Sequence, residues 1–519
     1  MWPIADKREV KESNIDESSR GVRQGFVLLI ALLALTAAGK AILHDTLDPD
    51  CFWHLKVAEA LHRQGIGPLV DDLSFASNKS PWTPYSWLAE LGMKAVWDLG
   101  GYRLAVAAQA LMQAGIVIVL AMIGCEAVKG RSGRGRYLSI VMLTAFGTAM
   151  MLPYLSFRPA TAGILLLGAI FWLVVRDWRM NGRSEAVWLA VPLTVLLTNI
   201  HLYVVIAPAI FAMAAAGTAW NRQWPSTRRY GLLTAACGLG CLMTPMLWGA
   251  IQTAWFYQHN DAMVAGPIIA EMRPFLSGIG GKINGLIILA MIICLWRRRA
   301  QLDGVNWLWL GFGLLLLLRL GRFAPLYALL AMPAMVRGID LFSDRMLCRP
   351  GLRLAMAGVL LIGCVRVGLA FPRAGDGMDQ WVNRHGPDTP GYPTAAAEFV
   401  QANVRPHTGH LINEFTWGGY LSWRFGGQYQ VLLDGRTQLY SRDFWRTAYL
   451  GDESLRSRWL NQLSADAAVL PMERSVFAPI LIHHGWTIAY RDQRAQVLIP
   501  PAAGQPAAGP PAAQVADTK

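Results

Sequence analysis

The sequence predicts a mostly α-helical membrane protein with about eleven transmembrane helices, followed by a small C-terminal α/β domain. Apolar segments of roughly 20 residues, long enough to cross a bilayer, recur along residues 24–371. Only 16% of the 519 residues are charged and 54% are hydrophobic, whereas soluble domains carry about 25% charged residues. Residues 372–500 mix polar and apolar positions instead, which indicates a domain in contact with water.

The candidate spans follow from the apolar segments and the polar stretches between them. Segment 305–337 is too long for one span and has Gly321 and two arginines near its middle, so it is interpreted as a helical hairpin. The first span is interpreted as a retained anchor, because no small-residue cleavage site follows a short apolar core. The predicted spans are 24–43, 103–127, 136–154, 160–176, 186–201, 204–220, 230–249, 282–297, 305–320, 323–337 and 353–371.

Basic residues favour one orientation of these spans. Each short segment assigned to the cytoplasm carries several Lys or Arg, as in KGRSGRGR at 129–136. The positive-inside rule then places residues 1–23 in the cytoplasm and residues 44–101 in the first extracytoplasmic loop of the cytoplasmic (inner) membrane. This distribution accounts for the net charge of +13 without nucleic-acid binding.

Residues 372–500 are predicted to form an extracytoplasmic α/β domain. The segments GHLINEF, QYQVLLDGR, ADAAVLPM, WTIAYRD and QVLIP indicate strands, and TAAAEFVQANV and DFWRTAYLGDESLRSRWLNQL indicate helices. Gly418-Gly419 is interpreted as a turn, and Asp434-Gly435 as a turn that ends a strand. The tail 501–519 is rich in Pro and Ala and is expected to be disordered.

The first candidate site directly follows the first span, in HDTLDPDCFWHL at 44–55. Asp48, Asp50 and His54 are the catalytic candidates, because ionisable groups at membrane depth are costly and tend to be functional. If a helix begins near Pro49, Asp50 and His54 share one of its faces, and Asp48 is placed to cap it. The alternative is a capped surface helix whose acids are merely solvated.

Further polar residues fall at other span ends on the same predicted face. Arg158, Arg319, Arg322 and His201 are candidates to bind a donor phosphate. The alternatives are a packing role or a helix-end hydrogen bond for His201, and interfacial snorkelling for Arg319 and Arg322.

A third group of side chains consists of candidates for substrate binding. Trp rings suit stacking on a sugar, but they also suit the membrane interface, so both interpretations stay open. The candidates are Trp82, Trp87, Glu90 and Glu271.

Several motifs of soluble enzymes are absent from the sequence. It has no Walker A motif, no GxGxxG after a strand, no HExxH and no GxSxG, so use of ATP is not expected. The seven cysteines are scattered and indicate no disulfide framework. The middles of the spans are nearly free of acids, which favours chemistry or binding at the outer surface over a conduction path.

The stretch DPDCFWHL and the span pattern over residues 1–371 resemble the GT-C superfamily of membrane glycosyltransferases, distantly the oligosaccharyltransferases or protein mannosyltransferases. The resemblance implies transfer of a sugar from a polyprenyl-phosphate-linked donor to an envelope glycan, lipid or protein acceptor on the extracytoplasmic face. It implies that Asp48 or Asp50 is the base or orients the acceptor. It also implies that Arg158, Arg319 or Arg322 holds the donor phosphate.

The sequence also departs from that resemblance. Oligosaccharyltransferases carry a second acidic pair in the second external loop, which helps to hold a divalent metal, whereas YLSFRPAT at 154–161 contains no acid. A divalent cation on Asp50 and His54 is therefore kept only as a candidate, and no other cofactor is expected. NEFTWGGYLSWRF and LLDGRTQLY look like recurring elements of bacterial membrane proteins of this type, and their residues Trp417, Tyr420, Asp434 and Arg436 are candidates to face the acceptor.

The sequence thus predicts a membrane glycosyltransferase that contacts membrane lipids, a polyprenyl-phosphate sugar and an acceptor. The alternative function is a non-catalytic flippase, polymerase partner or assembly factor for envelope polysaccharide.

Overall fold

The computed structural model describes residues 7–43, 47–77, 81–130, 135–259, 269–342, 349–370 and 391–501. It is mostly helical with a small C-terminal sheet, which confirms the predicted fold class. The start of the predicted cytoplasmic segment 1–23 and the predicted tail after residue 501 lie outside the described residues.

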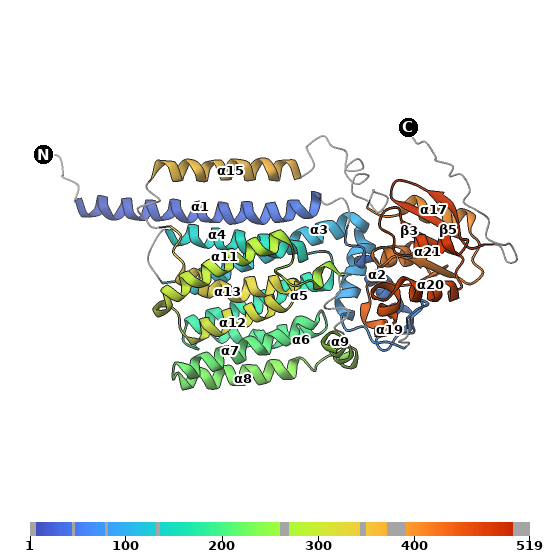
Figure 1. Ribbon diagram of the computed structural model, residues 1–519. Coiled ribbons are helices and arrows are strands. Elements are labelled where there is room, and N and C mark those ends of the chain that lie inside the picture. Colours follow the sequence, from blue (N-terminus) through green and yellow to red (C-terminus); the bar gives the residue numbers. More distant parts are fainter. Residues whose placement is uncertain are drawn as a thin grey trace.

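Figure 1 shows long helices side by side in one bundle, with α2 (Asp50–Gln64) across one end and the C-terminal domain beyond it. Helix α1 packs on α3 and α15, α3 packs on α5, and α12 packs on α13. The helices of the bundle are α1 (Lys7–Leu43), α3 (Trp87–Val128), α4 (Gly135–Met151), α5 (Pro159–Arg179), α6 (Ala190–Thr198), α7 (Ile206–Trp220), α8 (Trp224–Gly240), α9 (Leu247–His259), α11 (Gly278–Arg297), α12 (Gly304–Arg319), α13 (Ala324–Gly338) and α15 (Pro350–Ala370).

Short 3-10 turns connect these helices at several places. Four of them contribute residues that lie together with the start of α2: η1 (Leu152–Tyr154), η3 (Leu202–Val205), η4 (Ala270–Met272) and η6 (Gly321–Phe323). The other two in this part of the chain are η2 (Glu185–Leu189) and η5 (Arg299–Gln301).

Membrane crossing is supported by helix length and composition. Among the described residues, six helices are long and apolar enough to cross a membrane, and three shorter apolar helices accompany them. The predicted hairpin over 305–337 is confirmed, because α12 and α13 are separated by a break at Leu320. The predicted span 230–249 is not one helix, since α8 ends at Gly240 and α9 begins at Leu247. The structure therefore supports a multi-pass protein without establishing eleven spans.

Helix α3 consists of two segments joined by a kink. Gly101 has φ 57° and ψ −146°, a left-handed backbone that glycine adopts without steric cost. The first segment, Trp87–Leu99, packs near α2, and the second runs through the bundle. The kink explains how one helix of 42 residues contains both the segment Trp87–Leu99 beside α2 and the predicted span 103–127.

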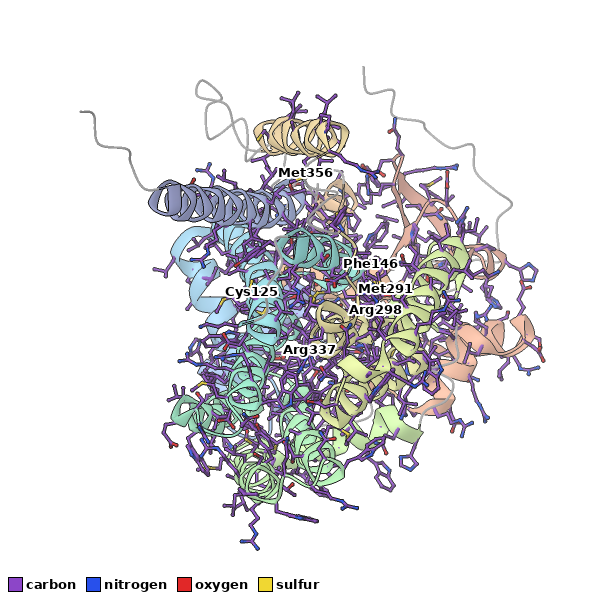
Figure 2. All side chains as sticks on the ribbon, turned by 90° about the vertical axis from the view of Figure 1, so that its left-hand side faces the viewer. Cys125, Phe146, Met291, Arg298, Arg337 and Met356 are labelled. Carbon is purple, nitrogen blue, oxygen red and sulfur yellow. The ribbon has the colours of Figure 1, made fainter. Side chains whose placement is uncertain are left out.

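The end of the bundle far from the C-terminal domain carries arginines in its last helical turns. Arg179 pairs with Glu126 at 2.6 Å, and the Arg337 guanidinium lies 4.5 Å from the centroid of the Trp178 ring. Figure 2 looks onto this end, where Arg298 and Arg337 are labelled. These positions agree with the basic segments that the sequence assigns to the cytoplasm.

The C-terminal domain is built on one mixed sheet of five strands in the order β2-β1-β3-β5-β4. The pairs β1–β2 and β1–β3 are parallel, with Leu411 opposite Val431 and Ala467, whereas β5 is antiparallel to both β3 and β4. Each predicted strand is found. The strands are β1 (His410–Asn413), β2 (Gln430–Val431), β3 (Ala467–Pro471), β4 (Thr487–Arg491) and β5 (Ala495–Ile499).

Helices and turns cover both faces of this sheet. The long helix predicted over 443–463 is broken, because a π-helical turn separates α19 from α20. The elements are α17 (Thr394–Asn403), η7 (Phe415–Trp417), α18 (Gly418–Phe425), η8 (Thr437–Leu439), α19 (Arg442–Trp445), η9 (Arg446–Leu450), α20 (Glu453–Gln462) and α21 (Ala478–His483).

Two adjacent glycines let α18 pack closely on its neighbours, Gly418 on the segment after β2 and Gly419 on the start of α2. A Cβ at Gly418 would lie 1.9 Å from the Leu433 carbonyl oxygen, and a Cβ at Gly419 would lie 2.6 Å from the Pro49 carbonyl oxygen. These glycines begin helix α18 and do not form the predicted turn. Tyr420 lies in the apolar core that α2 and the C-terminal domain share, so it does not face an acceptor.

A buried ion cluster provides the second tie between the first loop and the C-terminal domain. Arg436 is 1% exposed and its guanidinium bonds to Asp434 at 2.6 Å and to Asp71 at 2.8 Å. The Trp82 ring lies 5.2 Å from that guanidinium. Because Asp434 and Arg436 are buried in this cluster, the prediction that they face the acceptor is wrong.

Candidate active site between the membrane bundle and the C-terminal domain

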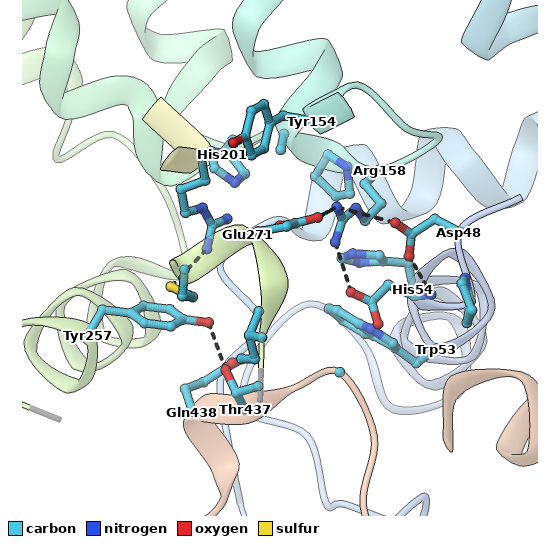
Figure 3. A pocket seen from close by; sticks show the side chains of 18 of the residues that line it. Asp48, Trp53, His54, Tyr154, Arg158, His201, Tyr257, Glu271, Thr437 and Gln438 are labelled. Atoms are coloured by element: carbon cyan, nitrogen blue, oxygen red, sulfur yellow. Dashed lines mark hydrogen bonds and ion pairs between the residues drawn. The ribbon is translucent and has the colours of Figure 1, made fainter. Parts of the chain in front are cut away.

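A cavity of about 340 Å³ lies at the end of the bundle, between α2 and the C-terminal domain. Its membrane side is formed by the start of α2, the loop before α5, and the turns η3, η4 and η6. Its other side is formed by Phe415, Thr416 and the segment 435–438. Figure 3 shows that side chains from these separate segments point toward one another.

Arg158 lies at the centre of an ion cluster on the membrane side of the cavity. Its guanidinium contacts Asp50 at 2.9 Å and Asp48 at 3.3 Å, and it also contacts Glu271. Its Nε donates to Ser156 Oγ at 2.7 Å, within the same loop. Pro159 begins α5 directly after Arg158, and this fixes the backbone from which the side chain extends.

Asp50 is the acid whose protonation is most affected by this environment. Burial and the Asp48 carboxylate raise the pKa of Asp50 to about 7, although Arg158 opposes the shift. Its Oδ2 accepts from Arg158, while its Oδ1 lies against Gly435 of the C-terminal domain. Asp48 Oδ1 accepts the backbone N–H of Asp50 at 3.0 Å, so Asp48 satisfies a donor at the start of α2 as predicted.

His54 follows one turn later and is held from behind by Glu90. Its Nδ1 lies 3.0 Å from Glu90 Oε1, which also accepts from Ser86 Oγ at 2.9 Å. Burial lowers the pKa of His54 well below its usual value, and Arg158 lowers it further, so the ring is neutral near pH 7. Glu90 therefore positions His54 and does not itself line the cavity.

Arg322 and His201 form the cationic and donor side of the cavity. Arg322 lies in η6 and extends beside Met272, with its Nη1 3.8 Å from the sulfur. His201 Nδ1 accepts the backbone N–H of Tyr203 at 3.2 Å. Burial and nearby arginines lower the pKa of His201 well below its usual value, so its ring is neutral near pH 7. Because Nδ1 accepts a hydrogen bond, the neutral ring carries its proton on Nε2. That N–H is available to an anion.

The structure brings seven of the predicted site residues to this cavity and leaves four away from it. Trp82 lies under Arg436, Trp87 donates to Asn199 Oδ1 at 2.8 Å, and Arg319 is exposed at the end of α12. Glu90 is buried behind His54. The residues that line the cavity are Asp48, Asp50, His54, Arg158, His201, Glu271 and Arg322.

Sequence reasoning missed the residues that the C-terminal domain contributes. Thr437 Oγ1 lies 2.9 Å from the Tyr257 hydroxyl, which joins η8 to α9 across the cavity. Gln438 and Thr416 also line it. LLDGRTQLY stands out as a motif, but the sequence does not show that Asp434 and Arg436 are buried in an ion cluster while Gly435 and Thr437 line the cavity.

Gly435→Ala is expected to disturb the site, because a Cβ at this position would lie 2.1 Å from Asp50 Oδ1. We expect the strain to lower the free energy of unfolding by about 1–3 kcal/mol, measured by thermal unfolding of the protein in detergent. Gly92→Ala is the control, since nothing lies within 4 Å of its Cβ position on α3. Equal unfolding temperatures for the two variants would show that Asp50 does not pack against Gly435.

A divalent cation does not fit the side chains at this site. The positions between Asp48, Asp50 and Glu271 are filled by the Arg158 guanidinium. Within the part of the chain that the structure describes, no three His, Cys, Asp or Glu side chains lie close enough to hold one ion. His54 bonds to Glu90, so the candidate pair of Asp50 and His54 is not arranged for a shared cation.

Known proteins resemble this chain in structure and not in sequence. No protein-family model and no curated protein matches it. The oligosaccharyltransferase AglB from Archaeoglobus fulgidus, in complex with an inhibitory peptide and a dolichol-phosphate, matches with a TM-score of 0.54 and 11% identity over 93% of this chain and 75% of that chain. The A. fulgidus oligosaccharyltransferase tethered to an acceptor peptide matches with a TM-score of 0.54 and 11% identity over 86% of this chain and 69% of that chain.

A third solved structure, ArnT from Cupriavidus metallidurans in the apo state, has a TM-score of 0.49 and 14% identity over 92% of this chain and 98% of that chain. At such low identity the likeness to AglB concerns the fold, including the helical bundle and the domain that follows it. This chain therefore shares the fold of the oligosaccharyltransferase AglB, in agreement with its resemblance to the GT-C membrane glycosyltransferases.

Proposed function

We propose that this protein is a membrane glycosyltransferase that moves a sugar from a polyprenyl-phosphate-linked donor to an acceptor hydroxyl or amide. The observation that carries the proposal is the cavity lined by Asp50, Arg322 and His201, at the junction of the bundle and the C-terminal domain. The fold supports it, because AglB, which shares the fold, was solved with a dolichol-phosphate.

In the proposed reaction the acceptor gives its proton to Asp50 while its oxygen or nitrogen bonds to the anomeric carbon of the donor sugar. The bond between that carbon and the phosphate oxygen breaks, and the lipid phosphate leaves. A pKa of about 7 suits Asp50 to this role, because a general base works best when its pKa lies near the working pH.

The departing phosphate gains negative charge, and two other residues that line the cavity, Arg322 and His201, are suited to receive it. Arg322 supplies a permanent cation, and His201 supplies a neutral Nε2–H. Both follow from turns at the end of the bundle, where a lipid phosphate would reach them from the membrane. The hydroxyl and amide groups of Thr416, Thr437 and Gln438 form the acceptor side.

The reaction is proposed to occur on the extracytoplasmic face of the cytoplasmic membrane. The cavity lies at the bundle end opposite to Arg298 and Arg337 (Figure 2), and arginines favour the cytoplasmic side. Envelope glycans, lipids and proteins on that face are the acceptor classes that we propose.

Arg322→Gln tests the proposed phosphate site. Loss of one charge-assisted hydrogen bond of about 1.5–3 kcal/mol is expected to weaken binding of polyprenyl phosphate by about 10- to 150-fold. Binding is measured by displacement of a labelled lipid from the protein in detergent. Arg319→Gln is the matched control, because this exposed arginine lies only three residues away and outside the cavity.

Turnover is measured in the same preparation, as release of labelled sugar from polyprenyl-phosphate donors. A wild-type protein that consumes a donor, with a slower Arg322→Gln variant, supports the transferase. A wild-type protein that binds the lipid phosphate and consumes no donor across sugars and acceptors points to the alternative, a non-catalytic carrier. Equal binding by the two glutamine variants would overturn the placement of the phosphate at Arg322.

A further inference from the structure

We propose that the Arg158 guanidinium takes the place of a divalent cation among Asp48, Asp50 and Glu271 and holds their carboxylates too far apart to share one ion, and that shortening this side chain lets them close around a divalent metal. The arginine would serve as a permanent internal cation that fixes the three carboxylates. The consequence for turnover, independence of divalent metals, rests on the proposed glycosyltransferase function. The prediction about metal binding can be tested without assuming that function.

The geometry supports this role because one side chain gathers carboxylates from separate parts of the chain. Asp48 and Asp50 come from the start of α2, and Glu271 comes from η4. All three carboxylates contact Arg158, which extends from the loop before α5 (Figure 3). A bound metal ion would join the start of α2 to η4 by coordinating the oxygens of these carboxylates.

The guanidinium uses its donors on all sides. Its Nε donates to Ser156 at 2.7 Å, its Nη1 donates to Asp50 at 2.9 Å, and its Nη2 contacts Asp48 and Glu271. A guanidinium is planar and carries five N–H donors in a fixed arrangement, so it can orient several carboxylates at once. Divalent metals require oxygens at about 2.0–2.6 Å from one centre, which the guanidinium prevents.

The charge balance also favours a cation at this position. Asp48, Asp50 and Glu271 would bring three negative charges into one cavity wall, and Arg158 offsets one of them. Although burial opposes ionisation of Glu271, Arg158 and Arg322 hold the pKa of Glu271 below its usual value. Removal of Arg158 would take away the cation that contacts all three carboxylates and would leave Arg322 to offset part of the charge of Glu271, and a divalent ion is the ligand that such a cluster attracts.

Arg158 thereby acts as a positioning residue for Asp50. It holds Asp50 Oδ2, which leaves Oδ1 directed toward Gly435 and the acceptor side of the cavity. A lysine at position 158 would keep the positive charge but could not contact three carboxylates in one plane.

The test is Mn²⁺ binding to the purified full-length protein, measured by electron paramagnetic resonance. We expect no saturable binding by the wild type and saturation at one ion per chain by Arg158→Ala. Adding Glu271→Gln to Arg158→Ala is expected to abolish the binding. Arg63→Ala is the matched control, because Arg63 pairs with Asp72 at 2.9 Å in the same loop but contacts no second acid there; no Mn²⁺ should bind.

The proposal is overturned if the wild type binds one Mn²⁺ and loses it in Asp50→Asn, or if folded Arg158→Ala binds none. Arg158→Lys keeps the positive charge and serves as the test if the alanine variant does not fold. This variant should bind no Mn²⁺, and binding of Mn²⁺ by it would contradict the proposal. In the wild type, turnover should withstand EDTA, and activity lost in EDTA and restored by Mn²⁺ would refute metal independence. If no donor is consumed at all, the proposed function fails while the Mn²⁺ experiment still decides the role of Arg158.

Discussion

Asp50→Asn is expected to reduce sugar transfer by a factor of about 10²–10⁴, the usual contribution of a general base. The amide keeps the size of the carboxylate and can still contact Arg158 through its oxygen, but it cannot accept a proton. Binding of polyprenyl phosphate should change little, because the phosphate is assigned to Arg322 and His201 and not to Asp50. The measurement is release of labelled sugar under single-turnover conditions.

The pH dependence of the wild type provides a second readout of the same residue. Burial raises the pKa of Asp50 to about 7, so the carboxylate is protonated and inactive below that pH and ionised above it. The rate should therefore rise with pH through about 7 and then level off, and the residual rate of Asp50→Asn should lack this rise. Asp72→Asn is the control, because its carboxylate is 43% exposed and pairs with Arg63 outside the cavity. Wild-type rates in Asp50→Asn would exclude Asp50 as the base.

Arg436→Ala is expected to produce the largest loss of stability. It removes the cation that pairs with the buried Asp434 and Asp71 carboxylates, whose side-chain exposures are 0% and 1%. Breaking a buried ion pair in this way costs about 3–5 kcal/mol. The change should lower the unfolding temperature in detergent and should loosen the C-terminal domain from the first loop.

Arg458→Ala is the matched control for that measurement, since Arg458 is exposed on α20 of the same domain and its removal should change stability by less than about 0.5 kcal/mol. A combined change of Arg436→Met, Asp71→Asn and Asp434→Asn should recover part of the loss, because no unpaired charge then remains buried. An unfolding temperature of Arg436→Ala equal to that of the control would show that the cluster does not hold the domain.

The proposed mechanism depends on the C-terminal domain as much as on the membrane bundle. Gly435 lies against Asp50, and Thr437 bonds to Tyr257 of α9 across the cavity. If the domain were displaced, Asp50 would lose one of its walls and would be better solvated, which would move its pKa back toward the usual value. The Arg436 cluster therefore contributes to the protonation of Asp50 through docking, although it does not contact the cavity.

Much of the fold could be predicted because apolar length and strand alternation are local properties of the chain. Segments such as 24–43 and 160–176 correspond to α1 and α5, and QVLIP corresponds to β5. The predictions failed where a helix ends for tertiary reasons. Span 230–249 crosses the end of α8, and the helix expected over 443–463 is interrupted by a π-helical turn.

The site was predicted in part. Acids and arginines at span ends stand out in an apolar sequence, which identified Asp50, Arg158 and Arg322. Trp82 and Arg319 have the same signal in the sequence, yet one is buried under Arg436 and the other is exposed. The sequence shows that charged and aromatic side chains lie near the predicted membrane surface, where burial of a charge is unfavourable. It does not show which partner stabilises each of them.

The sequence by itself determined a multi-pass helical protein with polar groups at one end of its spans and a C-terminal α/β domain, because hydrophobic length and periodicity fix those features locally. Only the tertiary structure decided which charges meet. Arg158 gathers three carboxylates, and Arg436 is buried between Asp71 and Asp434, 365 and 2 residues away along the chain. Such contacts arise from the docking of distant segments, and ion pairing depends on separations of a few ångströms that no local pattern in the sequence encodes.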